Sequence, residues 1–369
     1  MAFSCQTHTA YIYDRGGTRR VGALTPLTYV QWNRVLDDIS NALVRTVAPD
    51  WECAKMLAGV MPGRHELVIF RGTERVWEGP ISRLAYHRDY VEIEARDIMH
   101  YAYRTVLRNG YDNSYPNIST VINRCLDMLE GELARKEALD PPINVLPHVT
   151  AIITANDSRT SRKTIPKEAT LFEDIDSLAQ YAGMDYTVVG RRLILVDTHT
   201  VYAKTQTVTE NDFIGDVIVT LYGTDLATEA WVLGQDPQDG GPTPVGHYGA
   251  NDPYYGEWEV LDTPYNEGGE ESVTQAALDS QAQRNVAGKN PTPLMVRIPE
   301  GSTLNPAGIL KISDLVPGVR IPLRATLTAR EIAQMQKLRA VRVTEEQAGE
   351  TVQVTMTPAS LNDEDVEAP

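Results

Sequence analysis

The most regular pattern of apolar and polar positions in the chain spans residues 67–97. Three apolar-rich runs there are separated by short polar turns at 72–74 and 87–89. Short β-rich runs joined by three-residue polar turns are typical of an antiparallel meander. In the third run, apolar residues alternate with charged residues over 91–96. This two-residue period predicts a strand with one face in a core and the other in water.

In the middle run of this meander, the apolar residues change from odd-numbered to even-numbered positions around Gly79 and Pro80. Trp77 and Ile81 would face one side of a strand, and the apolar residues Leu84 and Tyr86 that follow would face the other. A residue without a side chain followed by one without an N–H tolerates a bulge or a bend. The pattern therefore predicts a kinked strand that curls its sheet towards a small barrel. Trp77 could stack on a sugar, but its place beside the bend favours a core residue.

The region before the meander is less regular. Short β-like pieces occur at 10–13 and 21–24, and residues 29–47 carry both a helical stripe and β-branched residues. We interpret 29–47 as a loop followed by a strand. Residues 51–60 predict a short helix, which ends before Pro62 because proline cannot continue it.

The central region contains two predicted helices and a hairpin. Residues 118–133 place apolar side chains at spacings of three and four, and this stripe could bind a partner but more often packs on its own domain. Thr170 and Glu173 form a capping box that opens a second helix, and Gly183 suits its end. Residues 186–196 then predict a hairpin with a turn at 190–191.

The β pattern returns in the second half of the chain. Residues 234–271 are rich in Gly, Pro, Asp and Tyr, and we interpret them as an extended aromatic arm that orders against a neighbour. Ser272 and Gln275 form a second capping box, which opens a helix with an alanine-rich face ending near 287. Strands are predicted at 217–222, 230–233, 294–298, 309–312, 319–323, 338–343 and 352–356.

Composition narrows the class of protein. A chain of 369 residues predicts two to four domains. Its 42% hydrophobic and 23% charged residues are those of a soluble globular protein. The net charge of −16 argues against binding nucleic acid through phosphate neutralisation. The N-terminus lacks a signal-peptide pattern, and no run reaches the ~20 apolar residues of a membrane span.

Chemical motifs are absent from the sequence. The cysteines Cys5, Cys53 and Cys125 form no metal or disulfide pattern, which favours synthesis in a reducing cytoplasm. There is no glycine-rich nucleotide loop, no HExxH and no GxSxG elbow. Asp174 and Asp176 lie two apart on a predicted helix and face different sides. We therefore predict no catalytic, cofactor-binding or metal residues, although a carboxylate pair for glycoside cleavage stays open because its separation is spatial.

Several segments resemble minor tail proteins of long-tailed actinobacterial phages, the siphovirus tail-hub or baseplate-hub group. The resemblance covers about 25–358, and the Trp-Glu-Gly-Pro element at 77–80 is its most specific part. The matching segments occur in the expected order: 32–40 (WNRVLDDIS), 65–71 (HELVIFR), 76–81 (VWEGPI), 171–193, and 314–319 (DLVPGV).

The resemblance implies an α+β, mainly β fold with two small antiparallel β-barrel domains and helical and α/β modules between them. The domains expected are an N-terminal barrel at 1–108, a helical insertion at 109–164, a small α/β module at 165–202, a second barrel at 203–358 carrying the arm 234–271, and an acidic tail at 359–369. β-rich ends flanking helical segments agree with this plan.

The function implied is that of a hub which caps the tail tube, connects it to fibres, and provides the channel for DNA ejection. Such hubs form three-copy rings, so the expected partners are copies of itself, tail tube and distal tail proteins, the tape-measure protein, and tail fibres or other minor tail proteins. DNA would pass without stable binding, and no cofactor or stable membrane insertion is expected. The protein would be made in the host cytoplasm and reside at the virion tail tip. Two alternatives are a tail-associated cell-wall hydrolase and the distal tail ring protein.

Overall fold

The structure is a computed structural model and carries side chains. Predictions for Gly183, Ser272 and the tail 359–369 fall outside the residues that it describes. The described residues are 8–48, 50–107, 121–139, 142, 146, 148–152, 169–182, 184–197, 206–215, 217–221, 223–234, 242–249, 252–263, 275–286, 294–299, 301–306, 308–327 and 330–358.

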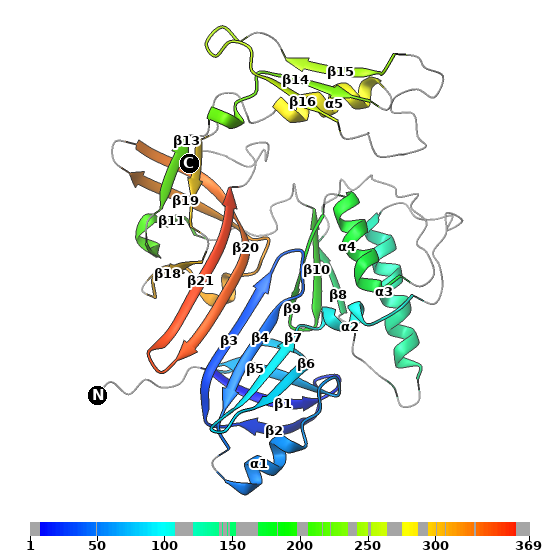
Figure 1. Cartoon of the computed structure of the whole chain (residues 1–369), viewed down its shortest axis with the longest axis vertical. Coiled ribbons are helices and arrows are strands. Elements are labelled where there is room, and N and C mark those ends of the chain that lie inside the picture. The colour runs from blue at the N-terminus through cyan, green and yellow to red at the C-terminus, as the bar shows by residue number, and fades with distance from the viewer. Residues whose placement is uncertain are drawn as a thin grey trace. The chain divides into compact units, whose positions relative to one another are not determined.

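The chain divides into two compact units, each made of several segments (Figure 1). The first unit comprises Met1–Asp216, Ile298–Ala325 and Met335–Thr357, and the second comprises Val217–Arg297, Thr326–Gln334 and Pro358–Pro369. Strands predominate over helices, so the mainly β composition expected from the sequence is confirmed. No helix in the described part of the chain is long and apolar enough to cross a membrane.

One large sheet dominates the first unit. Its hydrogen-bonded order is β12-β18-β21-β20-β3-β4-β7-β6-β5-β1-β2, and β19 joins β20 while β11 joins β19. The strands are β1 (His8–Asp14), β2 (Arg20–Leu24), β3 (Leu27–Val35), β4 (Asn41–Thr46), β5 (His65–Arg71), β6 (Glu74–Tyr86), β7 (Val91–Arg96), β11 (Val208–Thr209), β12 (Phe213–Ile214), β18 (Ser302–Leu304), β19 (Arg320–Leu327), β20 (Arg330–Glu346) and β21 (Gly349–Pro358). Among the described residues this order is an open path, so two closed barrels stay a prediction.

The predicted meander is present as β5, β6 and β7, and β6 changes partner at the predicted bend. Pro80 pairs with Glu66 on β5, whereas Ile81 pairs with Ala95 on β7. A Cβ atom on Gly79 would lie 1.9 Å from the carbonyl oxygen of Arg96. Since this contact is shorter than any real one, the bend requires glycine. Trp77 is 3% exposed, which confirms its place in the core.

The interpretation of 29–47 as a loop followed by a strand is wrong for its first half. β3 and β4 form an antiparallel pair across this region, with Val30 opposite Val44. Spacings of four residues fit a strand as well as a helix, because four is a multiple of the two-residue period. Val30 and Trp32 are both buried on one face of β3. The following helix α1 (Trp51–Ala58) is confirmed, and Asp50 caps it by accepting a 2.8 Å hydrogen bond from the Cys53 N–H.

Helices α2 (Met99–Tyr103), α3 (Val121–Glu137) and α4 (Leu171–Ala182) share one core with a three-stranded sheet. That sheet has the order β8-β10-β9 and consists of β8 (His148–Ile152), β9 (Met184–Val189) and β10 (Arg192–Asp197). The predicted capping box is confirmed, because the Glu173 N–H donates to Thr170 Oγ1 and the Thr170 N–H donates to Glu173 Oε2, each at 3.2 Å. Leu129 is fully buried, so the described part of the α3 stripe packs in its own unit.

The second unit contains β13 (Ile218–Leu221) paired with β17 (Leu294–Arg297), and a sheet of order β15-β14-β16. The strands of that sheet are β14 (Glu229–Leu233), β15 (Val245–Gly249) and β16 (Glu259–Asp262), and α5 (Gln275–Val286) packs against it. Two strands therefore lie inside the segment 234–271, where the sequence predicted only an extended arm. Its contact with a neighbour stays a prediction.

The strand predicted at 309–312 is absent from the described residues 308–312. Ile312 instead opens a short 3₁₀ turn, Ile312–Asp314, and is buried there. The strand predicted at 338–343 is the central part of β20, which runs over Arg330–Glu346. The predicted strands at 319–323 and 352–356 are confirmed as parts of β19 and β21.

Candidate functional site

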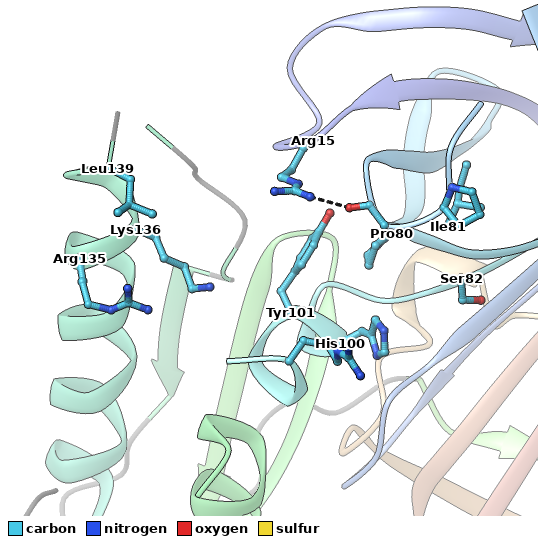
Figure 2. Close-up of a pocket in the computed structure, with 12 residues that line it drawn as sticks. Arg15, Pro80, Ile81, Ser82, His100, Tyr101, Arg135, Lys136 and Leu139 are labelled. Atoms are coloured by element: carbon cyan, nitrogen blue, oxygen red, sulfur yellow. Dashed lines mark hydrogen bonds between the residues drawn. The ribbon is translucent and has the colours of Figure 1, made fainter. Parts of the chain in front are cut away.

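A pocket of about 600 Å³ in the first unit is the candidate binding site (Figure 2). The bend of β6 and the loop before β5 form one side of it, α2 forms its centre, and the last turns of α3 form the opposite wall. Its lining residues are Arg15, Pro62, Gly63, Pro80, Ile81, Ser82, His100, Tyr101, Arg104, Arg135, Lys136 and Leu139.

Local chain geometry presents these side chains. Pro80 and Ile81 line the pocket at the point where β6 changes its partner from β5 to β7. Asp97 lies two residues before α2 and accepts a 2.9 Å hydrogen bond from the N–H of Met99, the first residue of the helix that carries His100 and Tyr101. Figure 2 shows Lys136 extending from α3 towards the side where Tyr101 lies.

A buried cluster of charges lies beside this pocket. Arg191 Nη1 donates to Glu66 Oε2 at 2.7 Å and to Glu78 Oε2 at 3.0 Å. Arg75 also pairs with Glu78. The Tyr101 hydroxyl donates to Glu66 Oε1 at 3.0 Å, so one pocket residue is bonded to the cluster. The Glu66 side chain is fully buried, and only 5% of the Glu78 side chain is exposed.

Burial and charge oppose each other in this cluster. Burial raises the pKa of Glu78 although Arg75 and Arg191 favour its ionised form. Burial acts to lower the pKa of Arg191, but hydrogen bonds and charges from Glu66 and Glu78 outweigh it and raise that pKa. Burial, followed by the negative charge of Glu66, raises the pKa of Tyr101. Arg191 therefore stays charged and binds both carboxylates.

The two carboxylates of the cluster are poor candidates for catalysis. Glu66 also accepts a 2.9 Å hydrogen bond from the Gly16 N–H, which comes from the turn between β1 and β2. A general acid or base must reach a substrate proton, yet these oxygens already accept from arginine, tyrosine and backbone donors. These hydrogen bonds and ion pairs join the β1–β2 turn, β5, β6, α2 and the β9–β10 turn. The cluster therefore cross-links segments of the fold.

A second set of bonds holds β9 against the turn after β3. Asp37 N–H donates to the Tyr186 carbonyl at 2.8 Å, and Tyr186 N–H donates to Asp37 Oδ1 at 2.9 Å. The Thr187 hydroxyl donates to the Val35 carbonyl at 2.9 Å. Lys337 on β20 pairs with Asp185 on β9. The small α/β module is thus fixed to the large sheet at several points.

Two of the histidines in the described part of the chain, His8 and His65, are buried and hydrogen-bonded. His8 Nε2 accepts from Trp32 Nε1 at 3.1 Å, so its proton is on Nδ1, which lies 2.5 Å from Glu345 Oε2. His65 Nδ1 accepts from the Met61 N–H at 2.9 Å at the start of β5. These contacts stabilise the fold. In the described ranges, no group of three or more His, Cys, Asp or Glu residues could hold a metal ion.

Asp174 and Asp176 likewise form no shared-proton pair. Asp176 Oδ1 accepts a 2.8 Å hydrogen bond from the Tyr186 hydroxyl, while Asp174 is buried on another side of α4. Sequence reasoning missed the pocket and the cluster of Glu66, Glu78 and Arg191. The only local signal for them was charged residues at buried-strand positions of β5 and β6.

Comparison with known proteins identifies the fold. No family model matches the sequence, and no curated protein matches it. Three solved structures of tail proteins, two of them from prophages, are similar. The 43 kDa tail protein of prophage MuSo2 from Shewanella oneidensis has a TM-score of 0.60 and 13% identity, over 95% of this chain and 98% of that chain.

The other two structures give the same result. Prophage tail protein gp18 from Listeria monocytogenes has a TM-score of 0.59 and 11% identity, over 94% of each chain. The tail protein from Neisseria meningitidis has a TM-score of 0.57 and 13% identity, over 96% of this chain and 97% of that chain. The chain therefore has the fold of these tail proteins.

Proposed function

We propose that this chain is a structural subunit of a phage tail, located in the virion as a hub at the tail tip. One observation carries the proposal. Tail proteins from three bacterial genomes match 94–96% of this chain and 94–98% of their own length. A match over entire chains indicates a shared architecture rather than one shared module, although a common fold alone does not fix a function.

The finer proposal is a three-copy ring that closes the tail tube of a long-tailed actinobacterial phage. Its partners would be tail tube and distal tail proteins, the tape-measure protein and tail fibres. It would be made in the host cytoplasm before assembly. The sequence resemblance supports this assignment, and the net charge of −16 suits a wall past which DNA slides, because like charges repel.

The ion pairs within the first unit favour a structural role over catalysis. Arg191 ties Glu66 and Glu78 together, and Lys337 ties Asp185 to β20. Such ion pairs hold segments that are distant in sequence in fixed positions. A subunit that binds several neighbours in an assembly requires this rigidity. A hydrolase would instead need carboxylates that can reach a substrate.

Mass photometry of the purified chain tests this function. The expected species has three times the 40.9 kDa mass of one chain. A six-copy ring would favour the distal tail protein instead. Zymography on purified cell wall supplies the second arm, and a monomer that clears cell wall would overturn the proposal in favour of a hydrolase.

A further inference from the structure

Another pocket of the first unit, with a volume of about 350 Å³, contains a buried arginine in its wall. Arg34 on β3 is 6% exposed and lines this pocket. The rest of the lining comes from the start of β6, the end of β9 and the segment 312–316: Glu74, Arg75, Val76, Val189, Ile312, Ser313 and Val316. All of these residues belong to the first unit. A volume at the lower end of the range for ligand pockets suits a small molecule or a single side chain.

The hydrogen-bonding capacity of the Arg34 guanidinium is only partly used. Nη2 donates to the Val76 carbonyl at 2.7 Å, and Nη1 donates to the Leu315 carbonyl at 3.4 Å. The guanidinium carbon lies 5.0 Å from the centroid of the Trp32 ring. The buried Nε–H has no acceptor among the residues that the structure describes. A buried donor without an acceptor costs free energy, and more so when the group is charged.

The charge of Arg34 also lacks a counter-ion in the described part of the chain. Burial lowers the pKa of Arg34 to about 10, so the guanidinium still carries its charge at pH 7. The negative charge of Glu74 favours this charged form, but Glu74 is exposed and makes no hydrogen bond or ion pair with Arg34. The second arginine of the pocket, Arg75, is paired with Glu78. Since a buried charge without a partner is costly, an anion in the pocket would stabilise the structure.

The lining defines the kind of anion. The planar edge of a guanidinium matches a carboxylate or a phosphate. Glu74 repels a dianion more strongly than a monoanion, which favours the carboxylate, and Val76, Val189 and Val316 offer hydrocarbon surface for a carbon chain. We propose that this pocket binds a carboxylate carried on a short aliphatic group, with Arg34 as its counter-ion. The carboxylate is that of a free small acid or of a glutamate side chain on a neighbouring chain. This inference goes beyond the tail function and does not depend on it.

Saturation-transfer NMR on the full-length chain tests the proposal with butyrate as the probe. Butyramide has nearly the same shape without the charge and is the matched ligand. Butyrate should bind about ten-fold more tightly or better, because hydrogen bonds to a charged acceptor are stronger. Equal affinities for the two ligands, or no binding of either, would overturn the proposal. A glutamate with both backbone ends blocked distinguishes the two sources. Tighter binding of this glutamate than of butyrate identifies a neighbouring chain, and the reverse order identifies a free acid.

Variants of the pocket locate the bound carboxylate. Arg34→Met should reduce butyrate binding to the level of butyramide, with circular dichroism as the check that the variant folds. Ser313→Glu keeps the buried arginine and adds a carboxylate at an exposed lining position, so it should weaken butyrate binding by about five-fold. Ser82→Glu makes the same change at an exposed position of β6 outside this pocket and should leave the affinity unchanged. Equal butyrate affinities of the two glutamate variants would overturn the proposal.

Glu74→Gln tests whether Glu74 itself neutralises Arg34 in solution. If an external carboxylate is the counter-ion, butyrate binds the original chain, and removing the negative charge of Glu74 strengthens that binding by about two-fold. If Glu74 moves onto Arg34 and fills the site, butyrate binds only to the Glu74→Gln variant. Binding confined to the variant would therefore overturn the proposal.

Discussion

Arg191 and Glu66 form a 2.7 Å ion pair although 125 residues separate them in the sequence. Arg191 lies in the turn between β9 and β10, and Glu66 lies on β5. The side chain of Arg191 is 17% exposed and that of Glu66 is fully buried. The contact fastens the small α/β module to the large sheet, and its strength is open to direct measurement.

Replacing Arg191 by methionine should lower the free energy of unfolding by about 3–5 kcal/mol, because the change leaves Glu66 and Glu78 buried without their shared cation. Urea unfolding followed by circular dichroism measures the effect. The matched control is Arg192→Met at the neighbouring, exposed position, which should change the free energy by no more than about 0.5 kcal/mol. Equal, small effects at both positions would mean that the cluster does not hold the module.

Substituting alanine for Gly79 should destabilise the first unit by about 3 kcal/mol or more, since the added methyl meets the Arg96 carbonyl at 1.9 Å and the backbone must move. Soluble yield and thermal unfolding report the loss. Gly223→Ala is the control, because a Cβ there meets nothing within 4 Å. If the two alanine variants are equally stable, the close approach of β6 and β7 is wrong.

The stability of the protein should depend on pH through Asp97. Burial raises the pKa of Asp97 to about 7, although the N–H groups of Ser40 and Met99 donate to it at 2.6 and 2.9 Å. The unfolded chain releases this proton near pH 3.8, whereas the folded chain keeps it up to about pH 7. The contribution of Asp97 to stability is therefore full below pH 3.8 and is lost as the pH rises through 7.

Comparison with Asp97→Asn isolates this effect, since asparagine does not titrate. The free energy of unfolding of the original chain, minus that of the variant, should fall as the pH rises from 4 to 7 and level off above 7. Urea unfolding at several pH values measures this difference. For Asp89→Asn, in an exposed turn, the corresponding difference should vary much less with pH. A constant difference for Asp97→Asn would show that this carboxyl has an ordinary pKa.

Elements encoded by local pattern were predictable from the sequence. The bend at Gly79 and Pro80 follows from a change of parity, and the helix at Thr170 follows from its capping box. Region 29–47 was misassigned because a spacing of four fits both a helix and a strand. The sequence did not predict β15 and β16, because a segment rich in Gly and Pro lacks the alternating apolar pattern that is typical of strands. Position 246 in β15, for example, requires glycine because a Cβ atom there would lie 2.4 Å from the backbone of Leu278.

The site features could not be predicted in the same way, because they arise only when distant segments meet. Glu66 and Glu78 stand beside continuous apolar runs on buried strands, but nothing near them in sequence indicates that their partner is Arg191. The pocket similarly combines Arg15, Arg104 and Lys136 from three separate elements. Their convergence is a property of the fold.

A cryo-EM map of the phage particle that carries this protein tests the central claim most directly. The account predicts density at the tail tip that fits this fold, repeated three times around the tube axis and in contact with the tail tube. A tail tip whose density accommodates no copy of the fold would contradict it, as would finding the protein only in the infected cell and not in the particle.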